Sequence, residues 1–233
     1  MKKTLLALAV AAALVPSLAM AEAGDIVVRL RATHIAPDES SKLGAQTAST
    51  YGAASAEAGI VGPAAKLEVD SNTIPEIDFS YYITKNIAAE LILAVGTRHD
   101  VKAVNITGGA TANLGSVNLL PPTLTLQWHF NPDQTIDPYI GAGLSYVRAM
   151  DRSLTLPVAG GLPIHIDRNS FGPAIQAGFD YNLENKWLVN FDVKKVWFGT
   201  DVKLQGVSIP GYQKIDSLDI DPWVVSVGFG KKF

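Results

Sequence analysis

The sequence predicts an all-β protein, an eight-stranded antiparallel transmembrane β-barrel with long outer loops and short periplasmic turns. Segments in which apolar residues occupy alternate positions recur along the chain, and this is the period of a strand with one apolar face. The connections between these segments alternate between long and short, as they do in bacterial outer-membrane barrels. After the N-terminal signal no apolar run is long enough for a helical span, so a membrane form must be a closed barrel.

The N-terminus has the pattern of a secretion signal. A pair of lysines stands at the start, Leu5–Val15 is the apolar run, and Ala19–Ala21 supplies the small residues that cleavage requires. We predict cleavage after this motif, which divides the chain into a signal peptide, residues 1–21, and a single barrel domain, residues 22–233. Cleavage after Ala23 is the alternative.

The charge balance bears on the partners of the chain. The 233 residues include 19 Lys and Arg and 22 Asp and Glu, and loss of the signal leaves 17 basic residues and a formal net charge of −5. This balance disfavours nucleic acid as a partner, because Lys and Arg dominate binding to phosphates. The absence of cysteine fits an exported protein.

The first three strands are predicted over Asp25–Ile35, Thr73–Ile83 and Ile87–Val95. In the first, apolar residues alternate with polar ones that include two arginines, and in the next two they alternate with acidic and other polar residues. Residues 37–72 are rich in Ser, Gly and Ala and lack sustained periodicity, which predicts a long loop with one short helix around Ala53–Ala58. A tight turn joins the second and third strands.

The fourth and fifth strands are predicted over Leu119–Phe130 and Ile136–Arg148. A long connection, residues 97–117, precedes them, and the turn-forming residues Asn131–Gln134 join them. Pro121-Pro122 lies near the outer start of the fourth strand, where two consecutive ladder donors are missing. Either the pair leaves a local gap between strands or the strand simply begins after it, and both interpretations stay open.

The sixth and seventh strands are predicted over Phe171–Tyr181 and Trp187–Gly199, after a third long loop at residues 150–169. The alternation in the seventh strand breaks after Lys194-Lys195, which predicts a bulge. A fourth long loop, residues 200–217, leads into the last strand.

The last strand is predicted over Trp223–Phe233, where aromatic residues and valines alternate with small or polar residues. Paired with the first strand, it closes the barrel and removes both edges. Aromatic residues gather beside the short turns, as in the girdle of a membrane barrel. They are Tyr81, Tyr82, Trp128, Phe130, Tyr181, Trp187 and Phe233.

The inward-facing positions carry eight charged residues, which could line a polar pore or form a paired network that fills the barrel. We favour the network, because eight strands leave an interior just wide enough for side chains and buried charges normally occur in pairs. The residues are Arg29, Arg31, Glu76, Asp78, Glu90, Asp180, Asp192 and Lys194.

Several glycines share the interior-facing phase. They either leave room for an apolar ligand or allow the sharp coiling of a small barrel, and the sequence does not divide these roles. Our predicted ligand path consists of Pro121, Pro122, Gly141, Gly143, Gly228 and Gly230.

No catalytic site, metal site or cofactor is predicted. His34, His99, His129 and His165 fall in four different elements and lack the close spacing of a metal-binding pair. No serine lies in a Gly-x-Ser-x-Gly nucleophile motif, so we expect a protein that is not an enzyme.

Several motifs together resemble the OmpW family of outer-membrane barrels, which includes the AlkL-type proteins. The resemblance spans essentially the whole chain after the signal. It rests on Leu119–Leu124 leading to Gln127-Trp128, on Asp137–Gly143, on Asp180-Tyr181 before Trp187–Asn190, on Asp221-Pro222-Trp223 and on the terminal Phe233.

The resemblance implies a barrel of the bacterial outer membrane with a narrow, apolar interior passage for the uptake of small hydrophobic molecules. These would leave sideways through the barrel wall into the membrane. The alternative is a structural, adhesion or receptor barrel that transports nothing. Expected partners are outer-membrane lipid and lipopolysaccharide, small hydrophobic solutes, and the outer-membrane assembly machinery, which the resemblance links to a C-terminal strand ending in an aromatic such as Phe233.

Overall fold

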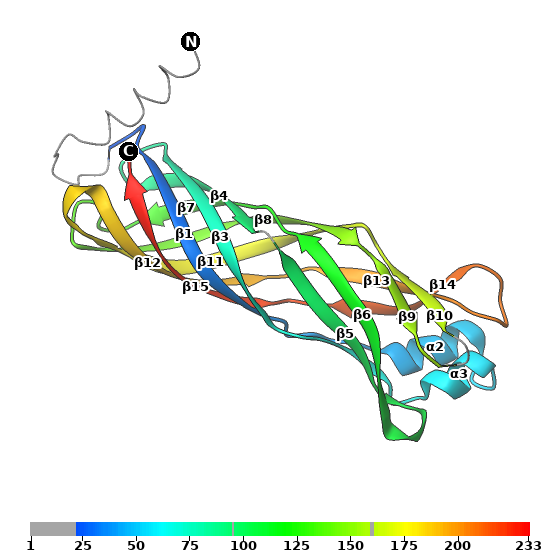
Figure 1. Ribbon diagram of the computed structural model, residues 1–233. Coiled ribbons are helices and arrows are strands. Elements are labelled where there is room, and N and C mark those ends of the chain that lie inside the picture. Colours follow the sequence, from blue (N-terminus) through cyan, green and yellow to red (C-terminus); the bar gives the residue numbers. More distant parts are fainter. Residues whose placement is uncertain (1–21, 95, 159–160) are drawn as a thin grey trace, which may run out of the picture.

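The structure is a computed structural model that describes residues 22–94, 96–158 and 161–233, and it is shown in Figure 1. The predicted signal peptide, residues 1–21, lies outside the described residues, so the cleavage site stays a prediction. Among the helices of the described ranges, none has both the length and the apolar character needed to cross a membrane.

Eight antiparallel strands close into a barrel, as predicted. In spatial order each strand pairs with its neighbour, and β8 pairs with β11 to complete the circle. The strands are β1 (Ile26–Ala36), β3 (Asn72–Tyr82), β4 (Ile87–Ala94), β7 (Thr123–His129), β8 (Ile136–Asp151), β11 (Asn169–Asn182), β12 (Trp187–Val196) and β15 (Trp223–Lys232). The predicted closure between the last and the first strand is present, with Arg31 opposite Gly228 and Ala36 opposite Trp223.

The outer surface of the barrel is an apolar band. Outward side chains such as Leu144, Phe171 and Val227 are exposed by 67%, 73% and 55%, whereas their inward neighbours along each strand are mostly buried. A belt of exposed apolar side chains is stable only where hydrocarbon surrounds it. Most of the aromatic residues beside the short turns, including Trp128, Trp187 and Phe233, are about half exposed, whereas Tyr82 is buried. The C-terminus lies at the same end of the barrel (Figure 1).

The long connections are not irregular loops, and here the sequence interpretation was incomplete. β5 (Thr97–Ile106) and β6 (Ala110–Leu120) form a hairpin that extends the wall beyond β4 and β7. A second sheet contains β9 (Ser153–Leu156), β10 (Leu162–Ile166), β13 (Gly199–Gln205) and β14 (Tyr212–Asp219). These strands are short, and β10 pairs with β13 across a long stretch of sequence, so local alternation alone did not reveal them.

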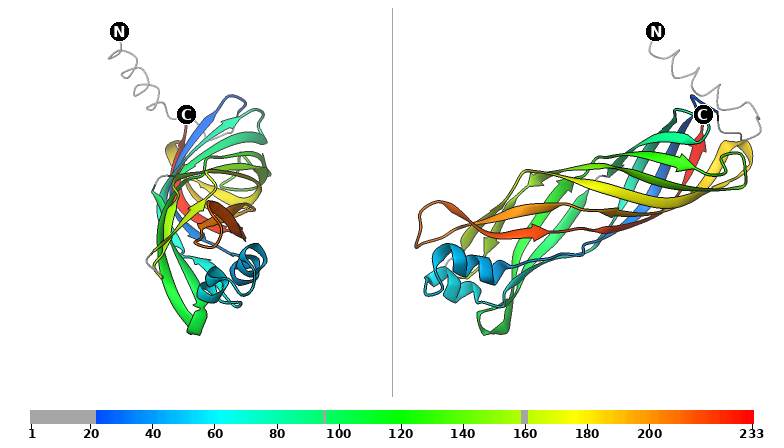
Figure 2. Two further views of the ribbon diagram at one scale, coloured as in Figure 1. Left: turned by 90° about the vertical axis from the view of Figure 1, so that its right-hand side faces the viewer. Right: turned by 180° about the vertical axis from the view of Figure 1, so that it is seen from behind.

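The first long connection contains more regular structure than the single predicted helix around Ala53–Ala58. α2 (Leu43–Tyr51) and α3 (Ala56–Val61) are separate helices, followed by β2 (Lys66–Val69), which pairs with β5. Ser55 caps α3 by accepting a hydrogen bond from the backbone N–H of Ala58. Figure 2 shows that these helices and the β13–β14 hairpin lie at the end of the molecule opposite the C-terminus.

Three-residue helical turns complete the element order, η1 (Thr107–Gly109) between β5 and β6 and η2 (Glu184–Lys186) between β11 and β12. The helices, the β5–β6 hairpin and the second sheet share one apolar core, which includes Leu43, Val101, Leu154 and Leu204. We call this assembly the outer cap. It is held by burial of apolar surface, and its core is continuous with the outer half of the barrel interior.

Two predicted strand boundaries are wrong. Leu119 and Leu120 belong to β6, and β7 begins only at Thr123, because the two prolines interrupt the chain between them. The predicted bulge after Lys194-Lys195 is absent, since β12 stays in regular register with β11 and β15 up to its end at Val196. The inward phase continues through Lys194, Val196 and Phe198, which line the barrel interior. Lys195 is buried although it lies out of this phase, and it contacts Asp38 and the carbonyl of Asp221.

Candidate ligand cavity and polar plug

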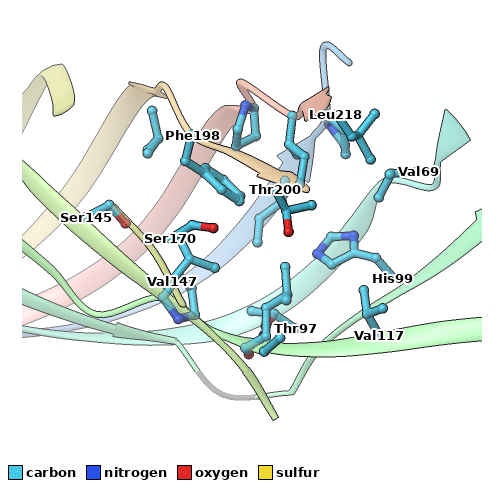
Figure 3. A pocket seen from close by; sticks show the side chains of 18 of the residues that line it. Val69, Thr97, His99, Val117, Ser145, Val147, Ser170, Phe198, Thr200 and Leu218 are labelled. Atoms are coloured by element: carbon cyan, nitrogen blue, oxygen red, sulfur yellow. The ribbon is translucent and has the colours of Figure 1, made fainter. Parts of the chain in front are cut away.

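A mainly apolar cavity lies in the outer half of the barrel, beneath the outer cap (Figure 3). It contains about 1190 Å³ of unfilled space, including its open part. Its walls come from barrel strands, from the β5–β6 hairpin and from β13, and they include Ile35, Ile92, Ala94, Val101, Val117, Val147, Ala149, Val196, Val202, Leu218 and Val224. A concave, largely apolar site with a few polar groups is the usual form of a small-molecule site.

The cavity exists because the inward face of the strands changes character along the barrel axis. On β8 the inward residues run from Tyr139 through Ser145 to Val147. On β1 they run from Arg29 outward to Ile35. The same face that carries charges near the periplasmic turns therefore carries aliphatic side chains near the outer cap.

Beneath the cavity, a network of buried ion pairs fills the barrel, and we call it the polar plug. Arg29 binds Asp180 through two contacts, Nε to Oδ1 at 3.2 Å and Nη2 to Oδ2 at 2.5 Å. Arg31 contacts Glu90 at 3.1 Å, and further contacts from it at 3.2 and 3.0 Å reach Glu76 and Asp78. Lys194 donates to Asp192 at 2.7 Å. All eight predicted interior charges thus belong to this network, which confirms the paired arrangement.

Uncharged polar side chains complete the plug. Gln127 and Gln176 donate to the same oxygen of Glu90 at 2.7 and 2.9 Å, and the hydroxyl of Tyr139 donates to Asp192 at 2.8 Å. Hydrogen bonds of this kind make buried charges tolerable, although Arg31 Nε and both carboxylate oxygens of Asp78 are buried without a hydrogen-bond partner among the described residues. Glu76 and Lys194 also line the cavity, so the plug forms its floor.

The barrel wall has an interruption beside the cavity, which we call the wall gap. Backbone pairing between β4 and β7 ends at Ile92 opposite Thr123, and pairing between β5 and β6 starts at Thr97 opposite Leu119. Between these pairs no backbone bond joins the described residues 93, 94 and 96 to residues 120–122. The two prolines lack N–H donors. β7 begins after Pro122, and among the described residues the ladder is open before it, so both sequence interpretations hold for that part of the chain.

The cavity reaches both sides of the wall gap. Its lining includes Ile92, Ala94 and Thr97 on one side and Leu119, Pro121 and Thr123 on the other. The hydroxyl of Thr97 donates to the carbonyl of Leu119 and spans the outer edge of the gap. An apolar interior therefore borders an incompletely paired part of the membrane-facing wall.

The predicted ligand-path residues separate into two groups. Pro121 lines the cavity and Pro122 follows it, whereas Gly141, Gly143, Gly228 and Gly230 are not among the lining residues. A Cβ atom on Gly143 would lie 1.9 Å from the carbonyl oxygen of Leu124, and one on Gly228 would lie 2.1 Å from that of Leu30. The space beside these glycines is thus filled by neighbouring strands, which matches the coiling role weighed for them.

The structure brings together a set of polar groups that sequence spacing did not reveal. One potential ligand atom each of His129, Asp137 and Asp180 lies within 4.8 Å of the others, although the residues come from different strands. His129 Nδ1 is 2.7 Å from Asp137, and Asp180 is held by Arg29. Both carboxylates already take part in buried hydrogen bonds with side chains of the protein, so we assign the three residues to the polar plug.

The comparisons with known proteins agree with this architecture. The model of the OmpW family matches residues 22–233. Outer membrane protein W of Escherichia coli is 31% identical over 234 residues, covering 100% of this chain and 99% of that protein. The dibenzothiophene metabolism operon protein PahQ of Pseudomonas aeruginosa is 24% identical over 174 residues, or 73% of this chain and 76% of PahQ.

A solved structure gives the same result. The crystal structure of the outer membrane protein OprG from Pseudomonas aeruginosa superimposes with a TM-score of 0.75 at 30% identity, covering 93% of this chain and 99% of OprG. Outer membrane protein W and OprG are outer-membrane proteins and not members of an enzyme family. A closed eight-stranded barrel, an apolar outer band and a family match over the whole described length lead to one conclusion: the chain belongs to the OmpW family of bacterial outer-membrane proteins.

Proposed function

We propose that the protein takes up small hydrophobic molecules through the outer membrane, with the cavity beneath the outer cap as their binding site. The observation that carries this proposal is the change from an apolar cavity to a polar plug within one barrel. Transfer of an apolar solute from water into the cavity is favourable by about 25 cal/mol per Å² of apolar surface buried. It gains nothing by entering the plug, where it would separate paired charges.

The wall gap supports a lateral exit. A solute that cannot pass the plug has to leave through the wall or return to the outside. The gap lies beside the cavity, and aliphatic side chains and Pro121 line it, so a solute can pass from the cavity into the bilayer while it remains in apolar surroundings. The name of PahQ refers to dibenzothiophene metabolism, and a relative associated with an apolar aromatic compound supports hydrophobic cargo.

The test is uptake by cells of a hydrophobic compound that they consume. Cells that lack the protein should take up the compound more slowly than cells that express it. Ala94→Trp should reduce uptake several-fold, because Ala94 is buried, lines the cavity and borders the wall gap. Ala142→Trp is the matched control, since Ala142 faces outward on β8 and a tryptophan there would contact lipid.

Equal uptake by cells with and without the protein would contradict the transport proposal and favour a structural, adhesion or receptor barrel. Normal transport rates in Ala94→Trp would contradict both the cavity as the binding site and the lateral route, because Ala94 lines the one and borders the other. Both variants are compared at equal amounts of folded barrel in the outer membrane, which heat-modifiable mobility in gels measures.

A further inference from the structure

One polar group in the cavity differs from the others. His99 of β5 is only 4% exposed, and Figure 3 shows its imidazole ring reaching into the cavity, on the side where Thr200 also points inward. Its neighbours in the lining include Leu67, Val101 and Val117. A buried imidazole among aliphatic side chains is costly unless its polar atoms have partners.

The backbone determines which ring nitrogen carries the proton. His99 Nδ1 is 2.7 Å from the carbonyl oxygen of Asp70. A carbonyl only accepts, so Nδ1 must donate, and the neutral ring then has its lone pair on Nε2. Asp70 is itself held, because its N–H donates to the carbonyl of Asp100 at 3.0 Å and Lys102 donates to its carboxylate at 2.9 and 3.0 Å. The ring therefore has a fixed anchor.

His99 Nε2 has no hydrogen-bond partner among the described residues. The other polar lining groups are already engaged in bonds within the protein. The hydroxyl of Thr97 donates to Leu119, that of Thr123 to Ser145 and that of Ser170 to Gly199, while Lys194 donates to Asp192, Glu76 pairs with Arg31, and Asp167 pairs with Lys203. His99 Nε2 is thus a fixed acceptor without a partner among the described residues, and it lies in mainly apolar walls.

We propose that this cavity selects apolar molecules that carry a single hydrogen-bond donor, such as phenols and alcohols, and that His99 Nε2 accepts that hydrogen bond. The inference rests on the proposed function and names the substrate class for the same site. An apolar body packs against the aliphatic walls, and its hydroxyl group donates to His99 Nε2, which has no partner among the described residues. In a site of low polarity such a bond discriminates strongly between a ligand that makes it and one that does not.

The test uses three probes of similar shape with the purified full-length barrel in lipid nanodiscs. Para-ethylphenol has a donor, para-ethylanisole has only an acceptor, and para-ethyltoluene has neither. Dissociation constants are measured for the natural protein and for His99→Asn at the same pH. Asparagine keeps an N–H group close to the position of Nδ1 for the bond to Asp70 and has no atom at the position of Nε2.

His99→Asn should weaken binding of para-ethylphenol about 3- to 10-fold, the size expected for one neutral hydrogen bond. It should change binding of the other two probes by less than about 2-fold, which reflects only the altered shape of the wall. Partition of each probe into lipid is the same for both proteins and cancels in the ratio. In the natural protein, para-ethylphenol should also shift the ¹⁵N resonance of His99 Nε2, and para-ethylanisole should not.

Equal losses for all three probes would overturn this inference, because His99 would then contribute shape alone. An equal loss for the anisole and the phenol would overturn it too, since the anisole offers only an acceptor. Either result leaves hydrophobic uptake standing. Failure of all three probes to bind the natural protein would overturn both this inference and the proposed function of the cavity.

Discussion

The periplasmic half of the barrel interior is filled by paired charges, whereas the outer half is a cavity with aliphatic walls. Both halves are built on the same strands, and β1 carries Arg29 and Arg31 in one and Ile35 in the other. In the narrow inner half, charged side chains reach one another across the lumen and satisfy each other. In the outer half, β5, β6 and β13 extend the wall and leave room that nothing polar needs to fill.

The comparison shows how a small barrel can combine stability with a binding site. The plug is stabilised by mutual pairing, so removal of one member leaves another charge buried without compensation. The aliphatic side chains of the cavity walls need no charged or hydrogen-bonding partner, so a substitution there alters the shape of the cavity more than the charge balance. Stability and ligand selection are therefore expected to depend on different residues.

The largest expected effect comes from breaking the plug with Asp180→Ala. This change removes the two contacts to Arg29 and a 2.7 Å bond from Asn190. We expect a loss of about 3–5 kcal/mol in the free energy of unfolding, because Arg29 would stay buried with the Ser80 hydroxyl at 2.6 Å and Glu90 at 3.4 Å as its remaining partners, and Glu90 already pairs with Arg31. Urea unfolding of the lipid-reconstituted barrel, followed by tryptophan fluorescence, measures the loss. A change below about 1 kcal/mol would mean that the plug is not a source of stability.

A smaller effect is expected at the glycines of the inner half. Gly143→Ala should cost about 1–3 kcal/mol, because its new methyl group would collide with the backbone of β7. Gly141→Ala is the matched comparison, since the closest atoms there belong to the flexible side chains of Gln176 and Gln127. The same unfolding assay applies. If neither substitution lowered the free energy of unfolding measurably, the space beside both glycines would be open, and they would again be candidates for lining the ligand path.

Glu57 is a buried charged residue of the outer cap that anchors a loop. Glu57 of α3 is fully buried and accepts bonds from the backbone N–H groups of Val207 and Ser208, both at 2.7 Å, and from the Ser208 hydroxyl at 2.6 Å. Burial alone would raise the pKa of Glu57, but these hydrogen bonds outweigh it and hold the pKa below its ordinary value. The carboxylate therefore stabilises the cap above its unfolded pKa, and this contribution is lost as the pH falls through the lowered value.

Glu57→Gln should accordingly loosen the β13–β14 tip at neutral pH by about 1–2 kcal/mol, a typical loss for hydrogen bonds to a charged group. Hydrogen exchange of residues 206–211 measures this opening. The difference between the variant and the natural protein should shrink in acid, because protonation of Glu57 removes the charge in the natural protein as well. If the difference in hydrogen exchange between Glu57→Gln and the natural protein did not depend on pH, the effect would come from packing and not from the charge of Glu57.

The smallest effect is expected from an exposed ion pair at the periplasmic turns. Lys85 pairs with Asp133, and both side chains are well exposed. Asp133→Ala should change the free energy of unfolding by no more than about 1 kcal/mol, since solvent screens such pairs. It also serves as the exposed counterpart of Asp180→Ala, because each variant removes one carboxylate from one ion pair. Similar losses in both variants would remove the contrast between the buried plug and the surface.

Local alternation was enough to determine the barrel. Each of the eight strands carries its own period of two, and closure of the last strand on the first follows from the need to pair every backbone group in lipid. The charged plug was also predictable, because Arg29, Glu90 and Asp180 are inward by phase and charges so placed have to pair. The resemblance to the OmpW family added the expectation of hydrophobic uptake.

Only the tertiary structure decided the outer cap, the cavity and the wall gap. The strands of the second sheet are short, and the pairing of β10 with β13 joins segments far apart in sequence, so their alternation is too brief to recognise. His99 looked like an isolated histidine, and it is the bond to Asp70, a residue on a neighbouring segment, that orients its free nitrogen into the cavity. Phase along a strand is a local property, whereas a cavity depends on which distant side chains meet around it, and that is settled only when the chain has folded.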